Sequence, residues 1–226
     1  MNYILSIVLI VEFLFNVIPS YAQTDGWKLE SDKDSMLVYT RVSESSPIKE
    51  LKIELDIAAS LSQLVAILND VDFYTDWVYN CTTSNVIENV DTGEFYYYIE
   101  MELPWPLSNR DLVQHSVQKQ DTATLIINMF THTESTDKKF REKKNIVRIK
   151  EGYIKWKLIP LSRNRTHLSY HLVTDPGGNI PAWLFNMVIE VAPTKTMSKL
   201  REIVSMDKYI NGADYIINYD SYPLVN

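Results

Sequence analysis

Apolar and polar residues alternate with a period of two along several stretches of the chain, most clearly in Ile48–Ile57. Charged residues there occupy every second position and separate aliphatic ones. This alternation is typical of an antiparallel strand with one buried face. Glu94–Leu103 repeats the pattern, with Phe95, Tyr97, Ile99, Met101 and Leu103 on one face. Asp91–Thr92–Gly93, just before it, predicts a hairpin turn.

Most of the remaining chain also has a strand-like composition. Further strands are predicted at Met36–Val42, Thr83–Val90, Arg110–Lys119, Ala123–Thr131, Val147–Lys150, Gly152–Pro160 and Thr166–Thr174. The two prolines in Pro104–Asn109 lack the N–H donors that a strand needs, so a loop is expected there.

The apolar period changes to that of a helix in three places. Ser60 is suited to cap a helix with Leu61, Leu64, Val65 and Leu68 on one face, and Val71–Asn80 predicts a second short helical piece. Within Asp175–Tyr209 a long helix begins near Pro181, and Pro193 is expected to kink it. Its predicted inward stripe in the first half is Leu184, Met187, Val188, Val191 and Ala192.

This order of elements predicts a single α+β domain. A twisted antiparallel sheet of this size tends to curl, and one long C-terminal helix laid in the concavity covers the inner face without filling it. We therefore expect a curved sheet around that helix, with two short helices, enclosing an apolar tunnel suited to an apolar ligand.

The N-terminus differs from the rest of the chain. Ile4–Ile18 is nearly all apolar, and small residues surround a candidate cleavage point after Ala22. This predicts a signal peptide at 1–22, a domain at 23–210 and a loosely held tail at 211–226. An uncleaved anchor is the alternative, although the apolar run is shorter than the roughly 20 residues of a membrane span. Export to the periplasm or the cell exterior is expected.

Charge and composition narrow the function further. The net charge of −7 argues against nucleic-acid partners, which need a basic surface. Cys81 is the only cysteine, so no intramolecular disulfide is expected, and the sequence contains no nucleophile or phosphate-binding motif. No cofactor is predicted.

Several motifs taken together resemble the START lipid-binding domain, from about Trp27 to Tyr209. The motifs are Trp27, the Tyr74/Trp77 pair, Leu103–Val113 (LPWPLSNRDLV), Tyr153–Pro160 around Trp156, and Asp175–Trp183 (DPGGNIPAW). The resemblance implies a helix-grip fold whose hydrophobic tunnel holds one lipid or sterol, without catalysis. It also implies a gate formed by Pro104–Asn109 and Ile180–Tyr209. Some animal sterol carriers of the family have an arginine where this chain has Ser116, so a sterol-specific function is not supported.

The residues expected to contact the ligand follow from the inner faces of these elements. They are Tyr97, Ile99, Met101, Leu103, Arg110, Leu112, Gln114, Trp156, Tyr170, Trp183, Leu184, Met187, Val188 and Val191, with Trp105 and Leu107 as gate residues. For Arg110 two roles remain open, a headgroup ligand and a structural anchor. Trp105 and Leu107 are suited either to packing or to dipping into a bilayer. The partners expected are a lipid-like molecule and transient membrane contact, with the chain a monomer.

Other candidate chemistry has simpler explanations. Glu100 and Glu102 lie on the polar side of an alternating strand, so a solvated face is expected. His167 and His171 are about 13 Å apart on a strand, too far to share a metal ion, and no metal site is predicted. Lys138–Lys144 is either a solvated loop or a contact for an anionic bilayer.

Two alternative functions remain. An enzyme of the wider helix-grip superfamily, such as an aromatase or cyclase, would use polar residues of the same cavity. A structural or signalling module would have a collapsed tunnel.

Overall fold

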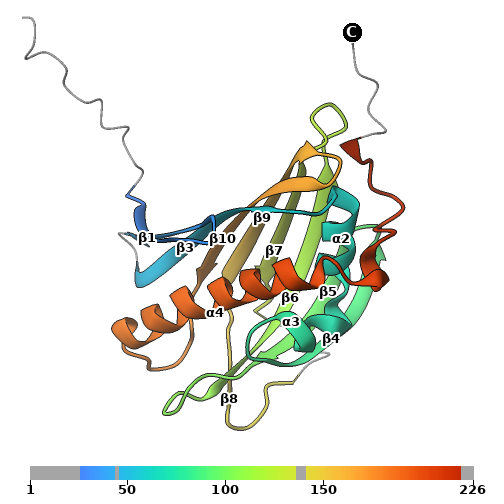
Figure 1. Cartoon of the computed structure of the whole chain (residues 1–226). Coiled ribbons are helices and arrows are strands. Elements are labelled where there is room, and N and C mark those ends of the chain that lie inside the picture. Colours follow the sequence, from blue (N-terminus) through green and yellow to red (C-terminus); the bar gives the residue numbers. More distant parts are fainter. Residues whose placement is uncertain (1–25, 44–45, 136–140, 220–226) are drawn as a thin grey trace, which may run out of the picture.

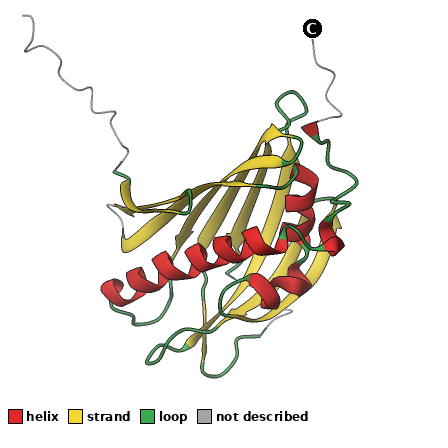
Figure 2. Cartoon of the chain, in the orientation of Figure 1, coloured by secondary structure: helices red, strands yellow, loops and turns green. Residues whose placement is uncertain are grey.

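The computed structural model describes residues 26–43, 46–135 and 141–219. Its centre is a curved, unclosed antiparallel sheet with the strand order β1-β2-β3-β10-β9-β7-β6-β5-β4 (Figures 1 and 2). The main strands are β1 (Lys28–Lys33), β2 (Met36–Ser43), β3 (Ser46–Ile57), β4 (Cys81–Asp91), β5 (Glu94–Met101), β6 (Asn109–Gln120), β7 (Ile127–Thr133), β9 (Gly152–Ser162) and β10 (Arg165–Thr174). A short strand, β8 (Ile146–Arg148), lies off this path and pairs in parallel with β6.

The helices lie where the apolar period changes. They are α2 (Leu61–Asn69), η1 (Val71–Phe73), α3 (Tyr74–Trp77), α4 (Ala182–Ile203) and η2 (Asp207–Tyr209). Ser60 caps α2 as expected, because its side chain accepts a hydrogen bond from the Gln63 N–H at 3.2 Å. Figure 1 shows α4 lying along the concave side of the sheet. None of the helices in the described part of the chain is long and apolar enough to cross a bilayer.

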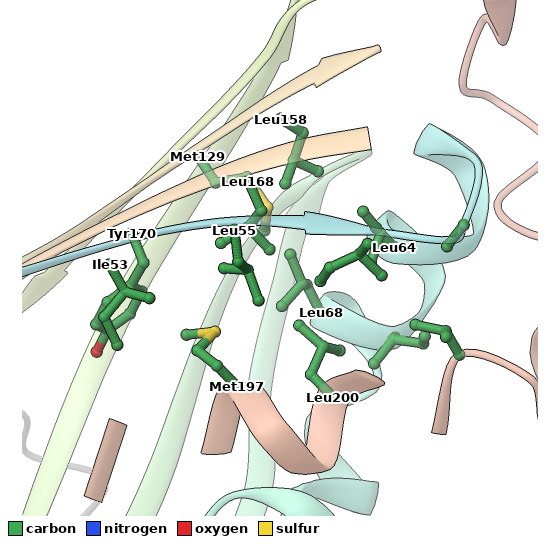
Figure 3. Close-up of a cluster of buried hydrophobic side chains, with 14 of the residues drawn as sticks. Ile53, Leu55, Leu64, Leu68, Met129, Leu158, Leu168, Tyr170, Met197 and Leu200 are labelled. Atoms are coloured by element: carbon green, nitrogen blue, oxygen red, sulfur yellow. The ribbon is translucent and has the colours of Figure 1, made fainter. Parts of the chain in front are cut away.

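The main core lies at one end of this arrangement, where α2 and the C-terminal half of α4 meet the sheet. Side chains from α2, α4 and the strands β2, β3, β7, β9 and β10 form this cluster, part of which is drawn in Figure 3. The labelled residues are Ile53, Leu55, Leu64, Leu68, Met129, Leu158, Leu168, Tyr170, Met197 and Leu200. The alternation seen in β3 is confirmed, since Leu51, Ile53, Leu55 and Ile57 are all buried.

The segment after α4 is packed rather than loose over the residues that the structure describes. The Ala213 N–H donates to the Ser62 carbonyl at 2.9 Å, and Ile216 is buried. Gly212 has a φ of 65°, and a Cβ there would lie 2.3 Å from Ser62 Oγ, so only glycine fits against α2. The expectation of a loosely held tail is wrong for 211–219, because α2 offers it both hydrogen bonds and an apolar surface. Residues 220–226, like the predicted signal peptide at 1–22, lie outside the described residues.

Candidate functional site

A cavity of about 200 Å³ lies between the concave face of the sheet and α4. Its wall comes from α3, from residues of the five strands β5, β6, β7, β9 and β10, and from α4. Nearly all of the side chains that line it are aliphatic or aromatic, and its few polar ones include Arg110, Gln114 and Thr133. An apolar space with a few polar groups is the usual composition of a small-molecule pocket.

The inner faces of the strands are placed as the sequence predicted. The predicted residues that line the cavity are Tyr97, Ile99, Met101, Leu103, Arg110, Leu112, Gln114, Trp156 and Tyr170, together with Val188 of α4. On β6 the inner face carries Arg110, Leu112 and Gln114, and Val113 points to the other side. Whether these residues contact a ligand stays a prediction.

The predicted face of α4 is only partly right in its first half, since Val188 and Ala192 line the cavity but Leu184, Met187 and Val191 do not. Trp183, Met187 and Val191 are 67%, 60% and 47% exposed, and Leu184 is half-buried but outside the cavity lining. The stripe that faces the cavity keeps Val188 and Ala192 from the prediction and is completed by Phe185, Ile189, Pro193, Thr196 and Met197.

Polar contacts explain why α4 is rotated about its axis relative to the prediction. Apolar residues surround the first half of α4 on nearly all sides, so spacing alone does not choose a face. Asn186 Oδ1 accepts from the Lys49 N–H at 2.9 Å, and Glu190 pairs with the Lys49 ammonium at 2.7 Å. These two residues, one turn apart, therefore hold that side of α4 against β3.

Some lining residues were not predicted as such. They include Tyr74, Trp77 and Val78 from the α3 region, Ile154 of β9 and Leu172 of β10. Ile154 and Leu172 are each two positions from a predicted residue on the same strand, so the alternation already contained the signal. The Tyr74/Trp77 pair was visible as a motif, but the sequence does not say that α3 closes this side of the cavity.

The tyrosines of the wall stay neutral. The Tyr97 hydroxyl donates to Gln114 Oε1 at 2.5 Å, and both side chains are buried. Burial raises the pKa of Tyr97 and the pKa of Tyr170 above the usual tyrosine value. Within the cavity these groups act as hydrogen-bonding dipoles and not as charges.

Arg110 is a buried cation at the edge of the cavity. Its guanidinium donates to the carbonyls of Pro176 at 2.7 Å and of Gly177 at 3.2 Å, and also to the Ser108 carbonyl. Burial lowers its pKa, and no carboxylate among the described residues pairs with it. These contacts favour the anchoring role over the headgroup role.

The loop Pro104–Asn109 presents its tip to solvent. The Trp105 side chain is 92% exposed, whereas Leu107 is half-buried. A turn hydrogen bond of 3.0 Å from the Leu107 N–H to the Pro104 carbonyl shapes this tip. A packing role for Trp105 is therefore wrong, because little of the described protein covers it.

A polar cluster on the convex face corrects the expectation for Glu100. Glu100 is only 9% exposed and accepts from the Tyr98 hydroxyl at 2.6 Å, and Lys143 pairs with it. Asp111 joins this cluster through two hydrogen bonds of 2.7 Å from Arg148. A solvated face was wrong for Glu100 because the 143–149 segment, including β8, covers this part of the sheet, whereas Glu102 is exposed as expected. Arg110 and Asp111 point to opposite faces, as predicted.

The remaining titratable candidates are satisfied locally. His167 bonds to Asp56 at 2.8 Å and Glu54 at 3.0 Å, and His171 bonds to Glu50 at 2.9 Å. Cys81 is buried, and burial raises the pKa of its thiol to about 11, so it stays protonated. The basic cluster Lys138–Lys144 is described only from Arg141 onward, where Lys143 belongs to the cluster around Glu100.

The fold and the cavity together define a helix-grip protein with an internal apolar binding space. The chain belongs to the START domain family, whose model matches residues 20–206.

Known proteins similar to the chain agree with this assignment. A crystal structure of a STAR-related lipid transfer protein from Xanthomonas axonopodis is 29% identical, covers 80% of this chain and 100% of its own, and has a TM-score of 0.73. An uncharacterised protein of Pseudomonas aeruginosa is 29% identical over 181 residues, which are 80% of this chain and 87% of the relative. The phosphatidylcholine transfer protein of Rattus norvegicus is 24% identical over 162 residues, 71% of this chain and 75% of the relative.

Proposed function

We propose that this protein binds one lipid-like molecule in the cavity beneath α4, without catalysis, and exchanges it with a membrane as a monomer. The observation that carries the proposal is the wall of the cavity. It is built from aliphatic and aromatic side chains, and polar groups such as Arg110 and Gln114 are few. Membership of a family whose members include lipid transfer proteins supports the same conclusion.

The absence of an acid–base pair supports binding over catalysis. Among the described residues that line the cavity there is no aspartate, glutamate, histidine or cysteine. Tyrosine also transfers protons in enzymes and is present in the wall, but burial raises the pKa of Tyr97 and of Tyr170 further from neutral pH, where proton transfer is most efficient. The buried carboxylates Glu100 and Asp111 lie on the other face of the sheet and do not line the cavity.

The size of the cavity implies movement during uptake. Its volume of about 200 Å³ is below the roughly 300–1,000 Å³ of ordinary ligand pockets. A lipid therefore enters only if part of the wall moves outward. The resemblance implied a gate made of Pro104–Asn109 and Ile180–Tyr209, and we assign the movement to the loop and to the N-terminal half of α4.

Exposed apolar side chains near the same elements support contact with a bilayer. Trp105 on the loop and Trp183 and Met187 on α4 are each more than half exposed. Tryptophan favours the interface between lipid and water. We propose that these side chains enter the bilayer surface during exchange. We also propose that residues 1–22 direct export to the periplasm or the cell exterior, on the basis of their sequence alone.

Uptake of a fluorescent fatty acid or phospholipid, with native mass spectrometry and organic extraction of the purified protein, tests the proposal. Val188→Trp fills the cavity and is expected to abolish uptake, whereas Val42→Trp, at a position 58% exposed on β2, retains it. Trp105→Ala is expected to slow transfer between vesicles while equilibrium binding stays unchanged. A protein that is empty as purified and takes up none of these probes would contradict the proposal, as would a Val188→Trp variant that binds normally.

A further inference from the structure

Two histidines face each other on the convex side of the sheet, away from the cavity. His115 of β6 is directly opposite His132 of β7 in the strand register. Their neighbours Gln114 and Thr133 line the cavity, so the two imidazoles point to the opposite face. Glu134 follows His132 by two positions and shares that face. Directly opposed residues of an antiparallel pair have Cβ atoms about 4.5–5.5 Å apart, so their side chains meet.

The possible ligand atoms of these three side chains converge. One ring nitrogen of each histidine and one carboxylate oxygen of Glu134 all lie within 4.8 Å of one another. Zinc binds nitrogen and oxygen at roughly 2.0–2.2 Å, which limits its ligand atoms to about 4.4 Å from each other. Small side-chain rotations therefore suffice to bring the three ligand atoms close enough to bind one ion. The side chains of His115 and His132 are 14% and 39% exposed, so an ion reaches them from solvent.

The surroundings hold the two rings in place. Glu94 of β5 contacts His115 Nε2 at 2.9 Å, and Tyr96 stacks on the same imidazole at 4.2 Å with an angle of 6°. Phe130 stacks on His132 at 5.8 Å. A carboxylate on a ligand histidine is a common orienting partner in metal sites. The Nε2 atom of His132 contacts Glu134, whereas its Nδ1 atom is buried without a hydrogen-bond partner among the described residues. Only one of the two ring nitrogens therefore has a partner.

We propose that His115, His132 and Glu134 bind a divalent transition-metal ion of the zinc class, and that Glu94 orients His115. Imidazole and carboxylate together suit Zn²⁺, Cu²⁺ and Ni²⁺. Three protein ligands leave at least one coordination position to water. The site lies outside the lipid cavity, and bound metal joins β6 to β7 on the convex face. This inference does not depend on the proposed function.

His167 provides a matched control. It lies on the same sheet and also contacts two carboxylates, those of Glu54 and Asp56. Among the residues that the structure describes, however, it belongs to no group of three possible metal ligands. Replacing it removes an imidazole of similar exposure without affecting the proposed ligands.

Calorimetric titration of ZnSO₄ into chelator-treated protein without a histidine tag tests the proposal. We expect one Zn²⁺ per chain, lost in His115→Ala and His132→Gln and retained in His167→Ala. Glu94→Gln is expected to weaken binding by about tenfold to a hundredfold, as for other orienting carboxylates. His132 is partly exposed, so its variant keeps the fold, which circular dichroism checks. Absence of binding of Zn²⁺, Cu²⁺ and Ni²⁺ to the folded protein would overturn the proposal. Stoichiometric Zn²⁺ that persists in the His115→Ala/His132→Gln double variant would also overturn it.

Discussion

The two halves of α4 meet the same sheet in different ways. In the C-terminal half, Met197, Leu200 and Ile203 are buried against α2 and the strands (Figure 3). In the N-terminal half, Phe185 and Ile189 border the cavity, and Trp183 and Met187 on other sides of the helix are exposed. The difference is one of degree, because Phe185 and Ile189 also belong to the core cluster and Met197 also borders the cavity. The C-terminal half is buried mainly in the core, and the N-terminal half covers most of the cavity.

The balance of forces that attach the two halves also differs. Apolar burial and dispersion dominate in the C-terminal half, and both are lost when the helix separates from the sheet. This half also has polar contacts, because Thr196 accepts from the Tyr79 N–H and Arg201 donates to the carbonyls of Asp34 and Ser35. The N-terminal half adds polar contacts from Asn186 and Glu190 to the β3 region. Water replaces such contacts at a small net cost in free energy. The comparison is the basis on which we propose that the N-terminal half is the part that moves to admit a ligand.

The largest expected effect is a difference in stability between two substitutions on α4. Leu200→Ala removes a side chain with 0% exposure from the packed end and is expected to lower the free energy of unfolding by about 2–5 kcal/mol. Ile189→Ala is expected to cost clearly less, because Ile189 borders an existing cavity and loses fewer contacts. Denaturant unfolding of both variants measures the difference. Equal losses would mean that the two halves are packed equally well.

Hydrogen exchange with and without bound lipid tests where α4 moves. We expect ligand to slow amide exchange in 182–192 and to leave 196–203 nearly unchanged, because the second half is already held by the core. The boundary is expected near Pro193, which lacks an N–H and so leaves the Ile189 carbonyl without its helical partner. That Pro193, where a kink is expected, marks the boundary between a moving and a fixed half stays a prediction until this is measured. Equal protection changes in both halves would contradict it.

The smallest expected effect concerns the ion pair between Lys49 and Glu190. Glu190→Gln is expected to change the free energy of unfolding by less than about 1 kcal/mol, since both side chains are partly exposed. Ligand exchange is expected to become faster and less sensitive to salt, because screening no longer weakens a contact that holds the moving half. Stopped-flow transfer at low and high ionic strength measures this, with Glu202→Gln, whose partner Lys199 is also on α4, as the control. If Glu190→Gln leaves the exchange rate unchanged, the ion pair does not hold the N-terminal half of α4 in place.

Strong periodicity made much of this architecture predictable. Leu51, Ile53, Leu55 and Ile57 alternate so regularly with charged residues that only one register buries them. The rotation of α4 was not predictable, since it depends on contacts of Asn186 and Glu190 with a strand more than a hundred residues earlier. β1 was missed because Lys28–Lys33 is polar, as edge strands often are.

The burial of residues on the convex face could not be predicted from the local sequence pattern either. Glu100 has the alternation of a solvated residue, and only β8 with the segment around it makes the position buried. The convergence of His115 and His132 depends on the pairing of β6 with β7, which the spacing of the two residues does not disclose. Within the cavity, the strands were predicted better than the helix because the inner side of a strand depends only on residue parity.

The contacts of Arg110 have a mechanical consequence. One guanidinium holds the carbonyl of Ser108 at the end of the loop and those of Pro176 and Gly177 ahead of α4. Neither segment leaves its place without breaking hydrogen bonds that also steady the other. Displacement of the loop and displacement of the helix start are thus coupled through a single side chain, and we expect the proposed opening of the cavity mouth to occur in one concerted step.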